Sequence, residues 1–350
     1  MEKELKPSIR FKGFTEVWEQ RKIGDILKSQ AINIDLEPSE FAKYEVIQQG
    51  NEPIAGYTNK EPFEKYEPIV LFGDHTLSLY KPKSPFLVAS DGVKAYFLEN
   101  VNGNFFYHLL SVNLPKNEGY KRYSSILKDK DFKLTYNRGE EEKISNLFDN
   151  LDSLITLHQR KCEKLQNIKK GLLEKMFPAN GKNVPEIRFK GFTEVWEQRK
   201  AKEVCSITTG KSNTQDQVDD GAYPFYIRSD VPVRSNKYLY DEEAVITIGD
   251  GNIGKVFHYV DGKFDLHQRC YKMSDFTELN AKYFYWYFST KFYKRAMSMT
   301  AKATVDSVRL EMIADMDIRY PSKKDEQNKI STLLFNLDSL ITLHQRKLMN

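Results

Sequence analysis

Two blocks of this sequence occur twice, and this duplication constrains the fold more than any other feature. The first block, residues 9–22 (IRFKGFTEVWEQRK), recurs without change as residues 187–200. The second block, residues 143–161, recurs as residues 329–347 with 16 of 19 positions identical. A solenoid repeats short units that share one continuous core, and this does not fit blocks so far apart. The pattern instead predicts a duplicated frame that carries two inserts.

The two inserts, residues 23–139 and 201–321, have no visible similarity to each other. Two equal frames related by a pseudo-two-fold axis match the approximate symmetry of a DNA duplex, on which a dimer normally reads two half-sites. One chain with two unlike inserts is therefore expected to read two unlike half-sites. Tandem duplication followed by drift is the alternative, but it explains poorly why the ends stayed nearly identical while the middles diverged.

The second shared block lies within a long helix that the sequence predicts over residues 140–176. Its acidic start, Glu140 to Glu142, suits the positive end of a helix dipole, and Pro178 follows its end. About 37 residues at 1.5 Å each span roughly 55 Å, which is too long for a small domain and favours a strut. Apolar residues follow the spacing of a coiled-coil seam with one stutter: Ile144, Leu147, Leu151, Leu154, Leu165, Ile168 and Leu172.

A second helix is predicted over residues 325–347, and the symmetry predicts that it packs antiparallel to the first. His158 and His344 occupy equivalent positions in the two helices, and a polar seam or solvent position is favoured over a metal ligand. The predicted seam residues are Ile330, Leu333, Leu337 and Leu340.

The second helix lacks a counterpart of residues 162–177, either as a natural variant or as a truncation. Leu165, Ile168 and Leu172 are therefore expected to find no partner within the chain. We expect them to be mobile, or to be covered by a neighbouring chain.

The composition is that of a globular protein with two cores: 350 residues, of which 40% are apolar and 29% charged. The start of the chain has no apolar run typical of a secretory signal, and no stretch approaches the ~20 apolar residues of a membrane helix. Cys162, Cys205 and Cys270 fit neither a zinc site nor a disulfide framework. A cytoplasmic location, no membrane partner and no bound metal are therefore expected.

The net charge of +4 arises in the two copies of the first shared block, because both inserts are close to neutral. A DNA-binding face must then depend on where the charges lie on the folded surface.

Two short motifs resemble nucleotide-binding loops, but their contexts do not fit. Residues 249–254 (GDGNIG) match G-x-G-x-x-G, which requires a following helix, whereas residues 255–260 are strand-like and another turn is predicted at Asp261-Gly262. Gly210-Lys211-Ser212 lacks the glycine of a phosphate-binding loop, because that position is Cys205. A helix is predicted over residues 305–313.

Polar and basic turns in both inserts are the candidate DNA contacts. Gln268 and Arg269 carry the side chains that pair bidentately with adenine and guanine edges. The sequence shows no catalytic constellation, so no catalytic residue is predicted. The candidate DNA-binding residues are His75, Lys81, Lys83, Ser90, Asp91, Lys94, Tyr120, Lys121, Arg122, Lys211, Arg228, Asn252, Lys255, His267, Gln268, Arg269, Lys302 and Thr304.

These features together resemble the specificity-subunit family of type I restriction–modification enzymes. The resemblance rests on the shared blocks and on two insert segments, residues 72–98 and 237–271. It implies an α/β fold with two target-recognition domains of twisted sheet, held apart by an antiparallel helix pair. The expected divisions are a first recognition domain, a spacer helix, a second recognition domain and a shorter spacer helix, at residues 1–139, 140–177, 178–321 and 322–350.

The resemblance also implies a non-catalytic role and a set of partners. The chain would read a split target on double-stranded DNA and direct two modification subunits, which bind S-adenosylmethionine and methylate adenine. Motor-nuclease restriction subunits would use ATP and Mg²⁺, so this chain itself would need no cofactor. The rival hypotheses are a stand-alone nuclease, against which the missing catalytic motifs speak, and a protein-binding scaffold that recognises no DNA sequence.

Overall fold

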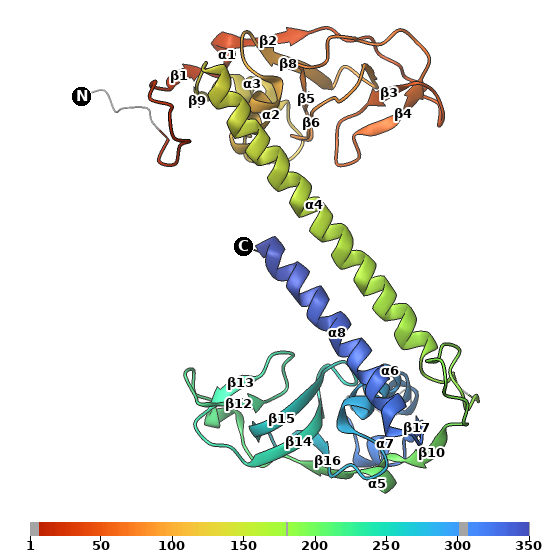
Figure 1. Cartoon of the computed structure of the whole chain (residues 1–350). Coiled ribbons are helices and arrows are strands. Elements are labelled where there is room, and N and C mark those ends of the chain that lie inside the picture. Colours follow the sequence, from red (N-terminus) through yellow and green to blue (C-terminus); the bar gives the residue numbers. More distant parts are fainter. Residues whose placement is uncertain (1–6, 180, 301–306, 350) are drawn as a thin grey trace. The chain divides into compact units, whose positions relative to one another are not determined.

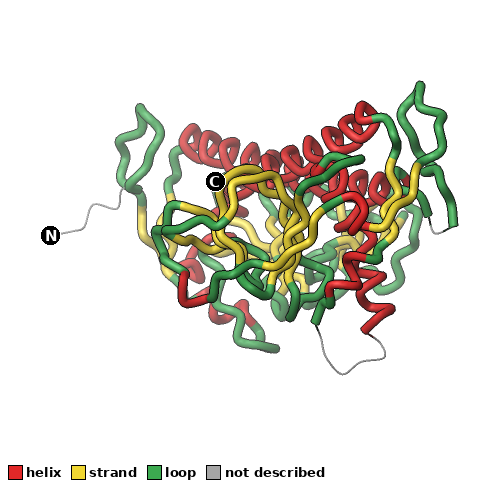
Figure 2. The backbone as a smooth tube through the Cα atoms, turned by 90° about the horizontal axis from the view of Figure 1, so that it is seen from below, coloured by secondary structure: helices red, strands yellow, loops and turns green. Residues whose placement is uncertain are grey.

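The computed structural model describes residues 7–179, 181–300 and 307–349. Its internal contacts divide the chain into two units, residues 1–155 and 156–350, and the division falls within one long helix. Both units mix helices with short strands that are joined by long loops (Figures 1 and 2). The predicted α/β class is confirmed.

The first unit begins with one strand of a two-stranded ribbon and a short helix, continues with the sheet strands and two helices, and returns to the second ribbon strand before the long helix. They are β1 (Glu19–Lys22), α1 (Ile23–Ile26), β2 (Leu27–Gln30), β3 (Tyr44–Ile47), β4 (Ile54–Thr58), β5 (Val70–Gly73), β6 (Leu79–Tyr80), β7 (Phe86–Val88), β8 (Val93–Leu98), α2 (Gly103–Val112), α3 (Tyr123–Lys128), β9 (Asp131–Leu134) and α4 (Arg138–Lys175).

The second unit repeats this order with longer strands and a longer internal helix. Its elements are β10 (Glu197–Lys200), α5 (Ala201–Val204), β11 (Ser206–Thr209), the 3-10 turn η1 (Thr214–Asp216), β12 (Tyr223–Tyr226), β13 (Val233–Ser235), β14 (Tyr240–Ile248), β15 (Phe257–Leu266), β16 (Cys270–Ser274), α6 (Ala281–Thr300), α7 (Leu310–Ala314), β17 (Asp317–Tyr320) and α8 (Lys324–Met349).

The identical 14-residue blocks form equivalent strand pairs. In the first unit β1 pairs antiparallel with β9, and in the second β10 pairs in the same way with β17. The backbone N–H of Ile23 donates to Lys130 at 2.8 Å, and that of Ala201 donates to Met316 at 2.9 Å. Each insert thus begins and ends on a two-stranded ribbon, which brings its two ends together.

The inserts share one strand topology although their sequences have diverged. The second unit has a six-stranded sheet in the order β11-β16-β14-β15-β12-β13. The first unit has the orders β2-β8-β5-β6 and β4-β3-β7. These match if β6 and β7 together take the place of the long β15. The parallel strand pairing in each unit agrees, because β3 pairs with β7 and β12 with β15.

Alternation along the strands produces two cores in each unit. In the first unit Val70 and Phe72 face the cluster formed with α2, whereas Leu71 faces the cluster formed with β3 and β7. In the second unit Val245 packs with α6, whereas Ile246 faces the cluster formed with β12 and β15. Strand β5 and the second half of β14 are therefore buried on both faces.

A bidentate ion pair joins the first shared block to the long helix in each unit. Arg10 donates from Nε and Nη2 to the carboxylate of Glu140 at 2.6 and 2.7 Å. Arg188 donates to Glu326 at 2.6 and 2.8 Å in the same way. Burial acts to raise the pKa of Glu140, but the hydrogen bonds from Arg10 and other donors hold that pKa below its ordinary value.

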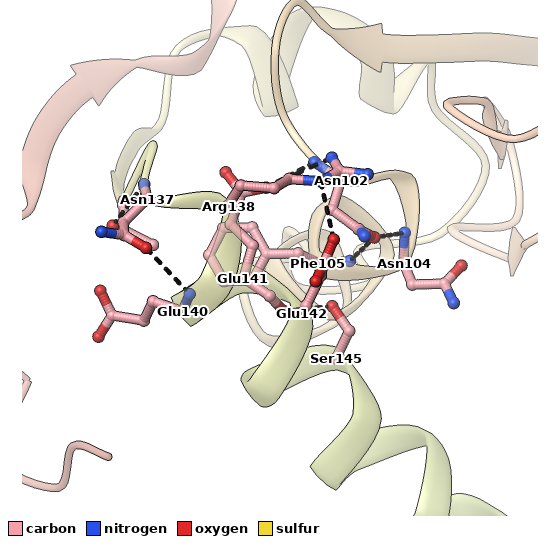
Figure 3. A network of polar contacts seen from close by, with 10 residues as sticks. Asn102, Asn104, Phe105, Asn137, Arg138, Glu140, Glu141, Glu142 and Ser145 are labelled. Atoms are coloured by element: carbon pink, nitrogen blue, oxygen red, sulfur yellow. Dashed lines mark hydrogen bonds and ion pairs between the residues drawn. The ribbon is translucent and has the colours of Figure 1, made fainter. Parts of the chain in front are cut away.

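The next residue of each long helix fixes the internal helix of the insert. The carboxylate of Glu141 accepts the backbone N–H of Asn102 at 2.8 Å, and Asn102 caps α2 with its own side chain (Figure 3). In the second unit Gln327 accepts the N–H of Asn280 at 2.9 Å, and Asn280 caps α6. The frame therefore holds each insert at its ends and at its internal helix.

Both predicted long helices are present as α4 and α8. Within the second unit they run antiparallel, since His158 contacts His344 while Lys169, further along α4, contacts the earlier residue Asp338. The two imidazole Nδ1 atoms lie 2.9 Å apart. The histidines therefore lie at a polar seam position, one of the two alternatives that the sequence left open.

The buried face of α8 differs from the predicted seam. The prediction was wrong for Leu340, which is 44% exposed, and Leu334 and Ile341 are buried beside Ile330 and Leu337 instead. The reason is a second neighbour, because α8 also packs against α6, where Tyr285 stacks on Phe335 at 5.7 Å between ring centroids. Contact with two helices rotates the buried face away from a simple two-helix seam.

The expectation that Leu165, Ile168 and Leu172 all lack a partner is also wrong. Leu172 packs against the core of the second unit, Leu165 is half-buried, and Ile168 is 42% exposed. In an antiparallel pair the end of α4 meets the beginning of α8, which is present. The exposed apolar residues of α4 lie mostly nearer its beginning: Leu147, Phe148, Leu151, Leu154, Ile155 and Leu157.

Two local predictions in the second insert need correction. Asp261 and Gly262 form no turn but lie inside β15, where Gly262 has a φ of +114° and pairs with Glu242. The helix predicted over residues 305–313 begins only at Leu310, and residues 307–309 are not helical. Among the described residues, no helix combines the length and apolar character needed to cross a membrane.

Candidate nucleic-acid interface

Three loops of the first unit meet beyond the end of β5. They are residues 74–78, 89–92 and 119–124, which we call the first loop cluster. The backbone N–H of Asp74 donates to Gly92 at 2.9 Å, and its carbonyl accepts the N–H of Tyr123 at 2.8 Å. These bonds place most of the polar turns predicted in this insert side by side.

An aromatic stack stands at the surface of the first loop cluster. The rings of His75 and Tyr120 lie parallel, with centroids 4.7 Å apart, and Tyr120 is 86% exposed. His75 Nδ1 donates to the carbonyl of Lys121 at 3.0 Å, and its backbone N–H donates to Gln49 at 3.2 Å. A stacked, exposed ring pair with nearby amide groups is suited to contact a base or a sugar.

Among the basic residues in and beside this cluster, two bond to neighbouring groups of the protein and one is exposed. Lys121 forms an ion pair with Glu118 at 2.5 Å, and Lys94, which lies in β8 beside the cluster, donates to the carbonyl of Asp91 at 2.5 Å. Arg122 is exposed. Ser90, half-buried, lies next to Asp91 in the same turn.

Lys81 and Lys83 are not brought into the first loop cluster. Lys81 lies beyond β6, where its ammonium donates to the carbonyl of Glu67 at 2.6 Å. Burial lowers the pKa of Lys81 to about 8. Lys83 is exposed two residues further on. Lys81 therefore satisfies backbone carbonyls within the unit.

The second unit forms an equivalent second loop cluster from residues 211–213, 227–229, 249–254 and 267–269. The backbone N–H of Gly249 donates to Arg269 at 2.7 Å, and its carbonyl accepts the N–H of Val308 at 2.6 Å. Asp74 makes the same two backbone bonds in the first unit. The GDGNIG segment joins β14 to the antiparallel β15, so the predicted hairpin connection is confirmed.

Two arginines converge on one carboxylate in the second loop cluster. Arg228 and Arg269 each place Nη1 3.2 Å from Oδ2 of Asp250. The side chain of Asp250 is 18% exposed, whereas those of Arg228 and Arg269 are 49% and 63% exposed. The carboxylate thus sits beneath two guanidinium groups that face solvent.

His267 is a support for this cluster and is only 4% exposed. Its Nδ1 accepts the backbone N–H of Arg269 at 3.1 Å, which leaves Nε2 to face Thr214 Oγ1 at 3.4 Å. Burial lowers the pKa of His267, and Arg228 adds to this effect. Gln268, in contrast, is exposed and donates to Asn213 Oδ1 at 2.5 Å.

The remaining candidates of the second insert lie around this cluster. Asn252 is exposed in the GDGNIG turn, and Lys255 holds its ammonium 5.6 Å from the ring centroid of Tyr293. Lys211 is exposed after β11. Lys302 and Thr304 lie outside the described residues.

Two contributors escaped the sequence analysis. Asp250 belongs to the GDGNIG motif, in which only Asn252 was predicted to contact DNA, and Gln49 follows β3 in a polar run without a motif. A signal for Asp250 was present, because a carboxylate in a tight glycine turn is well placed to orient a basic side chain from a neighbouring strand.

The described part of the chain holds no group of three or more His, Cys, Asp or Glu side chains that could bind a metal ion. Cys162, Cys205 and Cys270 are free and buried. Burial raises the pKa of Cys205 and of Cys270 to about 12, so neither thiol is prepared to act as a nucleophile.

Comparisons with known proteins agree with this architecture. Residues 193–350 match the family model described as the type I restriction modification DNA specificity domain. The specificity subunit of the type I restriction enzyme EcoDI from Escherichia coli is 25% identical over 147 residues. That match covers 41% of this chain and 32% of the relative, so the chain spans about a third of the length of this relative.

A solved structure supports the fold of the whole chain. The crystal structure of the type I restriction–modification S subunit from M. genitalium has a TM-score of 0.70 and 14% sequence identity, and the match covers 98% of this chain and 95% of that one. The duplicated frame, the α/β inserts and the family match to the second half converge on one assignment. Residues 193–350 therefore carry the type I restriction modification DNA specificity domain, and the fold of the whole chain is similar to that of a type I restriction–modification S subunit.

Proposed function

We propose that this chain is the sequence-specific DNA-binding subunit of a type I restriction–modification enzyme and has no catalytic activity of its own. Each loop cluster would bind one half of a split target on double-stranded DNA. The relative from Escherichia coli is a specificity subunit by name, which supports the assignment.

One observation carries the proposal: equivalent loops in the two units present different side chains. The first loop cluster exposes the His75–Tyr120 stack, and the second exposes Arg228 and Arg269 around Asp250. A shared scaffold with unlike polar surfaces is what reading two unlike half-sites requires, because base edges are distinguished by the donors and acceptors that meet them.

The enzyme activities would belong to partner chains. Two modification subunits would bind S-adenosylmethionine and methylate adenine, and restriction subunits would use ATP and Mg²⁺. The complex would act in the cytoplasm. Exposed apolar residues along α4, including Leu147, Leu151 and Leu154, offer a surface for such partners.

Selection of bound fragments from random double-stranded DNA tests the proposal. The purified full chain should enrich a motif of two short conserved parts separated by an unread spacer of constant length. A protein-binding scaffold would enrich no motif. Incubation of the same chain with DNA and Mg²⁺ should leave the DNA uncut, whereas a stand-alone nuclease would cleave it.

A further inference from the structure

Arg228 and Arg269 of the second loop cluster contact Asp250 only through Nη1, so each keeps Nε and Nη2 available as a pair of donors. Within the described residues, neither Nε nor Nη2 of either side chain has a hydrogen-bond partner. The Nε and Nη2 hydrogens form a planar fork that fits two adjacent acceptors. Asp250 thus fixes one edge of each guanidinium and leaves the other edge available.

Backbone geometry explains how Asp250 reaches this place. Gly251, the next residue, has a φ of +81°, a left-handed conformation that favours glycine and reverses the chain immediately after Asp250. Gly249, the preceding residue, has no room for a side chain, because a Cβ there would lie 2.5 Å from the carbonyl oxygen of Arg269. The glycines on both sides of Asp250 are therefore explained by the backbone path that places its carboxylate.

The chemistry of the group favours a base edge over a phosphate. The carboxylate of Asp250 carries a negative charge beside both guanidinium groups, and this charge opposes the approach of a phosphate. Guanine offers O6 and N7 as a pair of acceptors to an arginine fork, while the N4 amino group of its paired cytosine can donate to a carboxylate. Arginine and aspartate together thus complement one G·C pair.

The first unit lacks this arrangement at equivalent positions. Gln49 stands two residues beyond β3, as Arg228 stands two residues beyond β12. Gly92 makes the backbone bond to Asp74 that Arg269 makes to Gly249. A Cβ at Gly92 would lie 2.7 Å from Nε2 of Gln49, so the glutamine amide fills this space.

We infer, on the basis of the proposed DNA-reading function, that Arg228 and Arg269, oriented by Asp250, read guanine in the half-site bound by the second unit. The half-site bound by the first unit is read without this contact. The GDGNIG motif, which matches a dinucleotide-binding pattern by chance, serves as the support of a guanine-reading arginine pair.

The test compares enriched motifs from random double-stranded DNA for the full wild-type chain and for Arg228→Gln and Arg269→Gly, which install the residues of the first unit. The wild-type motif should contain at least one G·C pair in one half, and each variant should lose preference there while the other half stays unchanged. Replacing that guanine by 7-deazaguanine, which lacks N7, should weaken wild-type binding about tenfold and barely affect the matching variant.

Two further variants keep the test decisive. Arg269→Lys retains the charge but not the fork, so it should bind non-specific DNA as the wild type does and still lose discrimination at the guanine. Arg346→Gln on α8 makes the same charge change outside the loop cluster and should leave the motif intact. Thermal unfolding of each variant checks that the fold is preserved.

The outcomes distinguish a failure of the proposed function from a failure of this inference alone. A wild-type chain that enriches no motif would overturn the proposed function and this inference with it. A two-part motif that Arg228→Gln, Arg269→Gly and Arg269→Lys all leave unchanged would overturn the inference alone, as would a motif whose affected half contains no G·C pair.

Discussion

Gln49 and Arg228 occupy the same position of the fold in the two units, each two residues after a strand that pairs in parallel within its sheet. The last residues of these strands, Ile47 and Tyr226, accept equivalent backbone bonds from Ala89 and His267 at 2.8 and 2.9 Å. The backbone scaffold is therefore retained where the side chain that it presents has changed from a neutral amide to a cation.

Exchange of one insert should change one half of the target. Replacing residues 23–139 by the corresponding insert of a relative should alter the half-site read by the first unit and leave the other half as it was. The reason is that the frame holds each insert at its own ribbon, ion pair and helix cap. Motif enrichment with the chimera measures this, and a change in both halves would contradict the modular arrangement.

Substitution of Asp250 by Asn should increase non-specific DNA binding and reduce specificity. Removing the carboxylate releases the charges of Arg228 and Arg269, which can then contact phosphates. Binding of random DNA should become several-fold tighter and its salt dependence steeper by about one to two charges. Titrations at several salt concentrations measure both effects. Asp230→Asn, a nearby change of the same kind, serves as the control.

Substitution of Arg10 by Gln should destabilise the first unit and alter its response to acid. The pKa of Glu140 is held below its ordinary value, so its ion pair stabilises the fold above pH 4.5 and is lost as the pH falls through the folded-state pKa. In Arg10→Gln this contribution is missing at neutral pH, and the unfolding midpoint should fall by several degrees.

Thermal unfolding measured about every pH unit between pH 3 and pH 7 distinguishes this effect from a general loss of charge. Arg21→Gln, which removes an exposed ion pair with Glu19, should shift the midpoint little. Equal losses in Arg10→Gln and Arg21→Gln would contradict the role given to the buried pair.

Substitution of Glu141 by Gln should stabilise the first unit at neutral pH. Burial raises the pKa of Glu141, and one of its carboxylate oxygens, Oε1, is buried without a hydrogen-bond partner. The neutral amide keeps an acceptor for Asn102, as Gln327 does for Asn280 in the second unit. The gain should shrink as the pH falls and Glu141 itself becomes protonated. A lower unfolding midpoint at pH 7 would refute this expectation.

Acidification should loosen the contact between the histidines of α4 and α8. With Nδ1 atoms 2.9 Å apart, one ring must keep an unprotonated Nδ1 to accept from the other. Burial lowers the pKa of His158, and the charges of His344, Lys347 and Lys161 add to this. A histidine with a lowered pKa loses stability as the pH falls below its ordinary value of 6.5.

Hydrogen exchange of residues 340–348 should therefore accelerate between pH 7 and pH 5.5, once corrected for the intrinsic pH dependence of exchange, estimated at about tenfold per unit. The double substitution of His158 and His344 by Asn should remove this pH dependence. Identical corrected rates in the wild type at both pH values would show that the pair does not hold the end of α8.

The duplicated frame and the two long helices could be predicted from the sequence, because identical blocks fold identically and the 3.6-residue period is a local signal. The buried face of α8 could not, since Phe335 meets Tyr285 only after α6 has folded beside it. A seam pattern describes one neighbour, and α8 has two.

The candidate site was predictable only in part. His75 and Tyr120 were found as members of polar turns, but their stacking depends on loops brought together by the sheet. Lys81 looked equivalent to them in the sequence. It lies outside the first loop cluster, because it follows the end of β6 that points away from the cluster and there bonds to the carbonyl of Glu67. The grouping of Asp250 with Arg228 and Arg269 required the strand order, which one divergent sequence does not reveal.

Because residues 187–200 repeat residues 9–22 without change, the folding chain must choose between alternative strand pairings. β1 and β10 are identical in sequence, so each can form the ribbon meant for the other, with β9 or with β17. During synthesis the conflict is avoided, because β9 is complete before residues 187–200 exist. On dilution from denaturant all four strands are present at once. Pairing of β1 with β17, or of β10 with β9, then becomes a kinetic trap that is absent when the chain folds during synthesis.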